Sequence, residues 1–486
     1  MKTLLHISAG ALLLLMTGCM VGPKYKVPAT AITPAFKEAP QANAKPVDGW
    51  TPAQPGDATP RGPWWQQYQD AQLDALEQQV DSANQTLKMA EANFRQARAE
   101  IQYNRSFEAP TIGVGPEISA MRNSAHQPYF PSNLADGGES SFTLPLESSW
   151  ELDLWGRIRR SVSAAKEETQ ASAADVAAVR LSLHAELAVD YFELRSADAQ
   201  KKLLDNTVQA YTQALQLTQN LFEGGAAPMA DVAQAKTQLR DVQVMDSDIT
   251  ATRQQYEHAI AILIGKPPAA FSLPSDPLDV HPPALPAIPR VVPSDLLQRR
   301  PDIAAAERRM AEANERIGIA QAAWYPTLGL SAVAGFQGTS ALNWLTWPSR
   351  FWAVGPVFSE TLFDAGRRHA VKESALAGYD GAVANYRQTT LSAFQQVEDN
   401  LVVLHVLSTE SEQQHLATQS AEQSLQLFMN RYQGGVDTYL QVITAQTTAL
   451  NNQRNDIDIL RRQLEASVLL VRALGGSWNR AQLPHV

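Results

Sequence analysis

The sequence predicts a protein of mixed α and β class, in which short strands lead into very long helices and the whole unit occurs twice. Three observations predict this class. Similar segments recur at a nearly constant separation, one segment alternates apolar and polar residues, and two stretches of about 65 residues hardly contain glycine or proline. At 1.5 Å per residue, each such stretch makes a helix of about 100 Å.

The internal repeat is the strongest of the three observations. Ala109-Pro110-Thr111-Ile112-Gly113-Val114 matches Tyr325-Pro326-Thr327-Leu328-Gly329-Leu330 at a separation of 216 residues. Gly156-Arg157 matches Gly366-Arg367 at 210, and Gly224-Gly225 matches Gly434-Gly435 at the same 210. Such a constant separation predicts a duplicated structural unit. We expect each Gly-Gly pair, Gly224 with Gly225 and Gly434 with Gly435, to reverse the chain in left-handed conformations.

The long helices are expected to pack against partner helices. Ile158 to Phe222 contains no glycine or proline, and Arg367 to Gln433 contains only Gly378 and Gly381. The segments that follow them place apolar residues seven positions apart, which is typical of coiled-coil packing: Ala235, Val242, Ile249, Tyr256 and Leu263, then Ile443, Leu450, Ile457, Leu464 and Val471.

Composition excludes several classes of protein. The 486 residues are 44% hydrophobic and 19% charged, so a core can be buried and global disorder is excluded. Acidic residues outnumber basic ones by 50 to 40, and this net charge of −10 argues against nucleic acid as a partner. With one cysteine, Cys19, the chain can form no internal disulfide.

Cys19 follows a pattern that is typical of a secretory signal. A positive start at Met1-Lys2 precedes a short apolar stretch, Ile7 to Met16, and small residues lead up to the thiol. The alternative is a buried N-terminal helix with an incidental cysteine. The pattern resembles the lipobox of bacterial lipoproteins, which implies cleavage before Cys19 and acylation there, with palmitate among the lipids. Because Met20 and not aspartate follows, the resemblance implies sorting to the outer membrane.

We expect the chain to divide into six parts. Residues 1–18 form the signal peptide, 19–70 an acylated extended segment, 71–265 the first repeat, 266–293 a proline-rich linker of a small equatorial domain, 294–474 the second repeat, and 475–486 a C-terminal tail. Nine prolines in each of the ranges 23–63 and 267–293 support the extended segment and the linker. Strands are expected at about 110–120, 141–154, 326–336 and 350–363.

One expected strand shows clearly which face is polar. From Phe142 to Leu154, large apolar residues alternate with polar ones. Period two with acids on one face predicts a strand between lipid and water, with Glu147, Glu151 and Asp153 toward the lumen of a barrel. A half-buried strand of a soluble sheet is the alternative. Four strands per chain cannot enclose a water-filled bore, so the chain must form oligomers, and three copies give twelve strands.

Six motifs are spread along the chain: Cys19-Met20-Val21-Gly22-Pro23-Lys24-Tyr25, Trp64-Trp65, Glu151-Leu152-Asp153-Leu154-Trp155-Gly156-Arg157, Arg299-Arg300-Pro301-Asp302-Ile303, Leu362-Phe363-Asp364-Ala365-Gly366-Arg367 and Ala473-Leu474-Gly475-Gly476. Together they resemble the lipoprotein (NodT-like) branch of the TolC family, whose members are outer-membrane factors of resistance-nodulation-division (RND) efflux systems. The resemblance covers the mature chain. It implies a homotrimer with a twelve-stranded outer-membrane barrel, a periplasmic α-helical barrel, and partners in a periplasmic adaptor and an inner-membrane RND pump.

The resemblance also implies a periplasmic gate at the Gly-Gly turns. Tyr432 stands at the family's gate tyrosine, Asp231 at the aspartate that accepts its hydrogen bond, and Leu440 at a hydrophobic ring. Gln441 and Thr444 replace aspartates of relatives, and Asp437 replaces an arginine, so we expect repulsion between Asp437 and Asp231 and weaker cation affinity at the mouth. The alternative is that these residues have only a structural role, in which they pack against the turn or expose polar groups to water.

Motifs for catalysis or cofactor binding are not expected to function here. Ser163-Ala164-Ala165-Lys166 matches a β-lactamase pattern but lies within a long helix and lacks the companion motifs. The nine histidines are dispersed, and no nucleotide-binding loop is present. We expect no enzyme activity, no metal and no cofactor apart from the lipid on Cys19.

The leading hypothesis is an outer-membrane channel that passively conducts drugs or other small toxic compounds. Three alternatives remain open. They are metal-ion export by the same fold, which Thr444 disfavours, protein secretion, which the acylated Trp-Trp segment disfavours, and a structural envelope tether without conductance.

Overall fold

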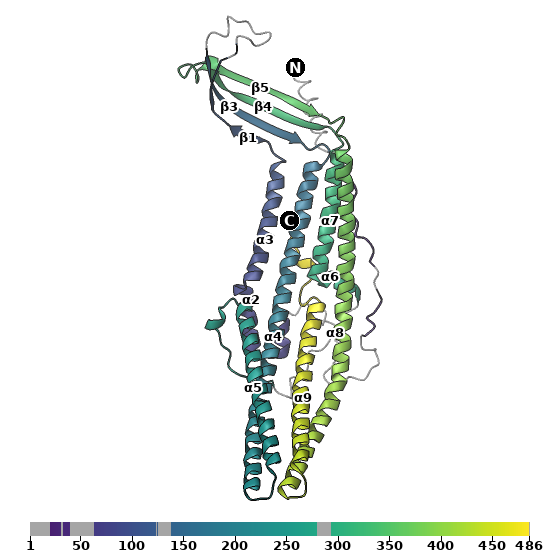
Figure 1. The fold of residues 1–486 in the computed structure, drawn as a ribbon. Helices are drawn as coiled ribbons and strands as arrows, with labels where there is room; N and C mark the ends of the chain where they lie inside the picture. The colour runs from purple at the N-terminus through teal and green to yellow at the C-terminus, as the bar shows by residue number, and fades with distance from the viewer. Residues whose placement is uncertain are drawn as a thin grey trace.

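The computed structural model describes residues 20–30, 33–38, 63–122, 124, 138–278 and 293–485. An antiparallel sheet lies at one end, and a layer of long helices runs from it to two hairpin tips at the other end (Figure 1). The mixed class predicted from the sequence is confirmed. Cys19 and the expected signal peptide lie outside the described residues.

Six of the helices form three pairs of equal length. The pairs are α3 (Gln85–Ser106) with α7 (Pro301–Ala322), α4 (Arg157–Glu223) with α8 (Arg367–Gln433), and α5 (Met229–Leu263) with α9 (Tyr439–Ala473). Their lengths are 22, 67 and 35 residues in both copies. The bounds of α4 and α8 are 210 residues apart and those of α3 and α7 are 216 apart, so the separations seen in the motifs extend to whole helices.

The sheet has five strands that occupy four positions. They are β1 (Thr111–Val114), β2 (Glu117–Met121), β3 (Glu139–Leu152), β4 (Thr327–Gly338) and β5 (Arg350–Ser359). The order is β1-β3-β4-β5, and β2 also pairs with β3 in the register of β1. Gly115-Pro116 separates β1 from β2, because proline has no N–H to donate to the ladder. The expected strands at 141–154 and 350–363 end earlier, at Leu152 and Ser359.

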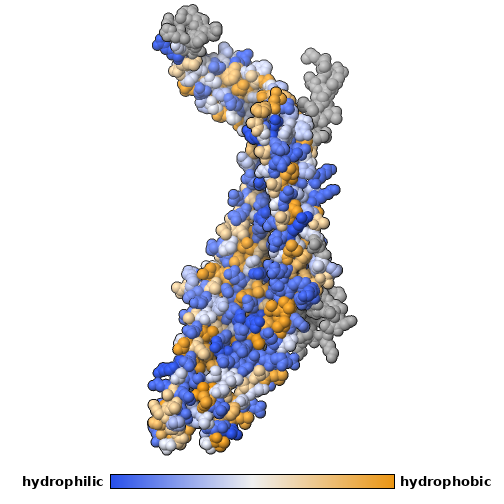
Figure 2. Space-filling view, turned by 45° about the vertical axis from the view of Figure 1, so that its right-hand side comes forward, coloured by the Kyte–Doolittle hydropathy of each residue, from blue (hydrophilic) through white to orange (hydrophobic). Residues whose placement is uncertain are grey.

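The register places the apolar side chains on one face. Leu152 lies opposite Leu328, which lies opposite Phe358. Residues directly opposite one another share a face, so the alternation on β3 continues across the sheet. The single chain leaves this face largely uncovered, and Ile112, Leu146, Trp352, Val354 and Phe358 are all exposed. Apolar side chains reach the surface of the sheet region in Figure 2.

Each long helix begins where a strand ends, at a glycine in the left-handed region. Gly156 precedes α4 with φ of 79°, and Gly366 precedes α8 with φ of 89°. The Asp153 carboxylate accepts hydrogen bonds from the backbone N–H groups of Ile158 and Arg159, at 3.1 and 2.9 Å. These bonds satisfy N–H groups that an uncapped helix would leave free.

The helical layer has different members in its two halves. Near the sheet, neighbours follow the order α3, α4, α7, α8, and toward the tips α5 packs on α4 and α9 packs on α8 and α4. Shorter elements lie near the middle, among them α2 (Ala71–Ala83) and α6 (Pro293–Arg299) (Figure 1). Trp64, Trp65 and Tyr68 anchor the largest core there against α4. In the described ranges, no helix has the length and apolar character needed to cross a membrane.

Candidate functional site: the helix tips

The two Gly-Gly turns have the same geometry. Gly224 and Gly434 are still helical, with φ of −77° and −78°, whereas Gly225 and Gly435 have φ of 74° and 71°. The N–H groups that follow bond back into the helix, from Ala226 to Leu221 and from Val436 to Arg431. The second glycine of each pair therefore supplies the left-handed conformation that was expected at these turns.

Tyr432 lies inside the tip rather than on its surface. Its ring packs against Tyr439 with a centroid distance of 5.1 Å and joins Ala235 and Val442 in a small buried cluster. The Tyr432 hydroxyl is buried and has no hydrogen-bond partner among the described residues. Burial raises the pKa of Tyr432; the nearby Thr218 hydroxyl opposes that rise, and the Asp231 charge adds to it.

The hydrogen bond expected between Tyr432 and Asp231 does not form within one chain. Asp231 lies in the first turn of α5, half-buried, and its charge is close enough to act on the Tyr432 hydroxyl. Burial raises the pKa of the Asp231 carboxyl. The packing of Tyr432 against Tyr439 accounts for the missing bond, because it directs the phenol into the apolar cluster.

Asp437 has a partner that the sequence interpretation overlooked. Arg431 Nε donates to Asp437 Oδ2 across the Gly434-Gly435 turn. Arg431 therefore neutralises Asp437 locally and weakens the repulsion that was expected between Asp437 and Asp231. The positions equivalent to this pair in the first repeat are Leu221 and Ala227, which cannot form it.

Leu440, Gln441 and Thr444 share one exposed face of α9, because Thr444 lies four positions after Leu440 and three after Gln441. Tyr439, Val442 and Ala445 fill the opposite, buried face. Leu440 keeps 56% of its surface exposed, although it is a large apolar residue. The described chain thus presents to its surroundings the three residues that the family resemblance places on the channel axis.

The three acids expected in the lumen have different environments. Glu147 is exposed on the polar face of β3, opposite Val333 of β4. Glu151 forms a two-point ion pair with Arg157, at 3.0 and 2.7 Å. Asp153 lies beyond the end of β3 and caps α4, so its assignment to a lumen-facing strand position is wrong.

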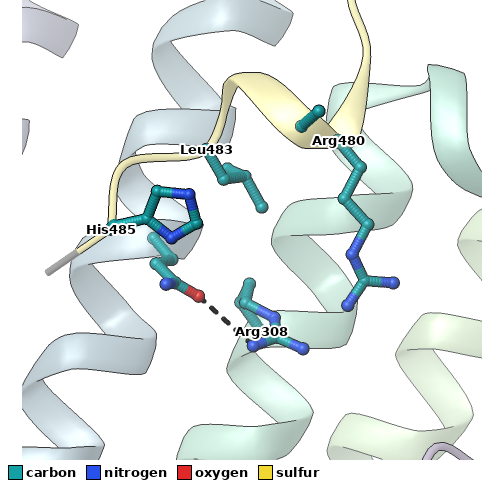
Figure 3. Close-up of a pocket in the computed structure, with 6 residues that line it drawn as sticks. Arg308, Arg480, Leu483 and His485 are labelled. Carbon is teal, nitrogen blue, oxygen red and sulfur yellow. Dashed lines mark hydrogen bonds between the residues drawn. The ribbon is translucent and has the colours of Figure 1, made fainter.

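Glu307 of α7 joins both ends of the described chain. Its carboxylate accepts from the Tyr25 hydroxyl at 2.6 Å and from Arg480 at 3.0 Å, and it also pairs with Arg308. A cavity of about 290 Å³ lies beside it, under the C-terminal tail, with Arg308, Arg480, Leu483 and His485 around it (Figure 3). Both guanidinium groups already have carboxylate partners, and the pair of Arg480 with Glu307 holds the C-terminal tail against α7.

The sequence interpretation also missed a buried contact between an acid and a histidine. Glu77 Oε2 lies 2.6 Å from His184 Nδ1, and Trp65 stacks on the imidazole at 4.4 Å between ring centroids. Burial raises the pKa of Glu77 to about 7, although His184 opposes the rise. Within the ranges that the structure describes, no group of three or more His, Cys, Asp or Glu side chains could hold a metal ion.

Comparisons with known proteins agree with this arrangement. A family model described as outer membrane efflux protein matches residues 76–266 and 292–476. The chain is 31% identical to the toluene efflux pump outer membrane protein TtgF of Pseudomonas putida, over 99% of this chain and 98% of the relative. The outer-membrane channel OprN superposes with a TM-score of 0.85 at 28% identity, covering 94% of this chain and 99% of that chain. VceC of Vibrio cholerae gives 0.78 at 30% identity, covering 86% and 99%.

A sheet with an uncovered apolar face, continued by helices of about 100 Å, defines the class of outer-membrane channels. The chain belongs to the outer membrane efflux protein family, as the motifs predicted. Its location is the outer membrane, and its function is that of an efflux channel.

Proposed function

We propose that three copies of the chain assemble into one passive channel, which has no catalytic chemistry or cofactor of its own. The channel receives drugs or other small toxic compounds from a periplasmic adaptor and an inner-membrane RND pump. The name of the relative TtgF refers to toluene efflux, which supports small apolar compounds as the substrate class.

The single observation that carries the proposal is the incompleteness of the sheet. In the described chain, β1 and β2 form one edge and β5 the other, and neither edge has a further partner. Unpaired strand edges are unfavourable in a membrane, and only a closed barrel removes them. Four strand positions are too few for a bore, whereas three chains supply twelve.

The helical layer supports the same assembly. Apolar side chains are exposed at its two margins, with Met89 and Tyr103 on α3 and Leu391, Leu416 and Leu427 on α8. Burial of such surfaces between copies stabilises an oligomer by about 25 cal/mol per Å² of apolar area.

We also propose that Cys19 carries the lipid and lies close to the membrane. The residue after it, Met20, packs against Gly156, where a Cβ would approach Met20 Cγ to 2.6 Å. The Val21 N–H donates to the Trp155 carbonyl at 3.1 Å, and Arg160 Nε donates to the Val21 carbonyl at 2.6 Å. These contacts hold the start of the mature chain at the junction of sheet and helices.

Complementation tests the proposal. In a host that lacks its own outer-membrane efflux component, the chain is expressed with its adaptor and pump, and intracellular accumulation of a fluorescent drug is measured. Accumulation should fall, and the solubilised protein should have the mass of three chains. A monomer, or unchanged accumulation with all three components present, would contradict it.

A further inference from the structure

The loop between β4 and β5, residues 339–349, exposes large apolar side chains at the end of the sheet far from the helices (Figure 1). Leu342 is 95% exposed, Leu345 62% and Trp347 72%. Three exposed apolar side chains in so short a loop indicate that the loop meets something other than water.

The polar groups of this loop bond to one another. The Asn343 carbonyl accepts from the Thr346 hydroxyl at 2.8 Å and from the Ser349 hydroxyl at 2.5 Å. The Asn343 side chain accepts from the Ser340 N–H at 3.2 Å. These hydroxyl and amide groups thus bond within the loop, while Leu342, Leu345 and Trp347 are exposed, which is the reverse of a loop that faces only water. The buried Trp344 Nε1 has no partner among the described residues.

Two aromatic contacts show that the loop continues the apolar face of the sheet. The Trp344 ring packs on Phe142 at 5.6 Å, and Phe142 shares its face with Leu144 and Leu146. The Arg350 guanidinium lies over the Trp347 ring at 4.4 Å. Arg350 of β5 lies directly opposite Phe336 of β4 in the strand register. Its side chain is therefore attached on the same apolar face of the sheet.

Arg350 is a cation at the edge of an apolar surface. Its Nη1 donates to the Trp347 carbonyl at 2.9 Å, and no carboxylate of the described residues lies within ion-pair distance. Tryptophan favours the boundary between headgroups and acyl chains, and a basic residue there attracts anionic lipid. Trp347 and Trp352 therefore supply interfacial aromatic rings, and Arg350 supplies a cation for the phosphate of a lipid headgroup.

We propose that the β4–β5 loop and Arg350 bind the phosphorylated glycolipid of the outer leaflet. Leu342, Leu345 and Trp347 enter the acyl boundary, and Arg350 pairs with a headgroup phosphate. This proposal rests on the proposed function, because it requires the sheet to lie in the membrane with the loop at its outer surface. Continuity with the apolar face, and a cation that has no carboxylate partner among the described residues, favour a lipid over a protein partner.

Lipid retention tests the proposal. Purified full-length protein is reconstituted in nanodiscs of phosphatidylcholine alone, with lipid A, or with phosphatidylglycerol, and retained lipids are counted by native mass spectrometry. Arg350→Gln should lower lipid A retention about fivefold, as expected for one basic residue at an anionic surface. Arg316→Gln is the matched control, since Arg316 is an exposed arginine of α7 paired with Glu312. Arg350→Lys should retain most of the preference.

A second measurement locates the loop. Lipids brominated near the headgroup should quench less of the total tryptophan fluorescence in Trp347→Phe than in wild type. Equal lipid A retention in wild type and Arg350→Gln would overturn the proposal, as would Trp347 fluorescence that only an aqueous quencher or a bound protein affects. A stronger preference for phosphatidylglycerol than for lipid A would also overturn it. If wild type conducts in bilayers while these tests fail, the proposed function stands and the lipid site does not.

Discussion

Arg431 and Asp437 form an ion pair across the second Gly-Gly turn, at the outermost end of the helical layer. Arg431 is more than half exposed, so water screens the pair and its contribution to stability is small. Its consequence is electrostatic. Because Arg431 neutralises Asp437, Asp437 adds no net charge to the exposed mouth that Leu440, Gln441 and Thr444 form.

We expect the two members of this pair to have opposite effects on ion selectivity. Arg431→Gln leaves Asp437 uncompensated and should raise cation selectivity, whereas Asp437→Asn leaves Arg431 and should lower it. The double variant should return to the wild-type value. Reversal potentials in a KCl gradient measure all four proteins, and shifts of the same sign in both single variants would exclude a role for the pair at the mouth.

Packing around Tyr432 is expected to keep the tip closed. Tyr432→Ala removes the ring from its contact with Tyr439, at a cost of about 3 kcal/mol or more per chain, and should raise the open probability. Tyr432→Phe keeps the ring and removes a hydroxyl without a partner among the described residues, so it should leave conductance near wild type. Single-channel recording compares them. Equal opening by both variants would show that the hydroxyl bonds across subunits and carries the closure.

The two faces of β4 should respond differently to charge. Leu330→Arg places a charge on the apolar face, opposite Trp150, and should cost about 2–4 kcal/mol near the midplane. Ser331→Arg, one residue along and opposite Ser149, should assemble nearly normally. The measurement is the fraction of heat-modifiable oligomer in the outer membrane; equal losses would mean that the faces are assigned the wrong way round.

Glu77 should make stability depend on pH. Its pKa is raised to about 7 in the folded chain, so the folded state binds the proton more tightly than the unfolded state does. Stability from this group is therefore fully present below the unfolded pKa of about 4.5 and is lost as pH rises through 7.

Glu77→Gln mimics the protonated form, and its melting temperature should exceed that of wild type increasingly from pH 5 to pH 8. Circular dichroism in detergent measures this difference. Glu100→Gln, which changes an exposed carboxylate of α3 that does not act on Glu77, should follow the wild-type profile. A constant difference between Glu77→Gln and wild type across this range would show that Glu77 does not titrate there.

Cys19→Ser should abolish lipid modification while leaving the oligomer intact, because the strands supply their own membrane embedding. Mass spectrometry of the mature N-terminus measures the modification. An unmodified Cys19 in the wild-type protein would contradict the proposal of an anchor.

Much of the fold could be predicted because it depends on patterns that repeat. The Gly-Gly pairs mark both chain reversals, and the alternation from Phe142 onward identifies the apolar face that Leu328 and Phe358 extend. The ends of strands were harder to predict. Asp153 continues the alternation of the strand, but it caps the helix that follows.

The site was harder to predict because it depends on contacts between distant segments. Tyr439 covers Tyr432, and His184 of α4 meets Glu77 of α2 more than 100 positions earlier in the chain. Arg431 is the exception. Five residues, the Gly-Gly pair among them, lie between it and Asp437, so the motif Arg431-Tyr432-Gln433-Gly434-Gly435-Val436-Asp437 already contained both charges.

The most direct test of the central claim is the ionic current through a planar lipid bilayer that contains the purified full-length protein. Wild type should give discrete current steps, and Leu440→Ser, which removes an exposed apolar side chain from the expected constriction, should enlarge them or lengthen their open times. A membrane that demonstrably contains the oligomer, yet carries no current with either protein, would contradict the assignment of this chain as an efflux channel.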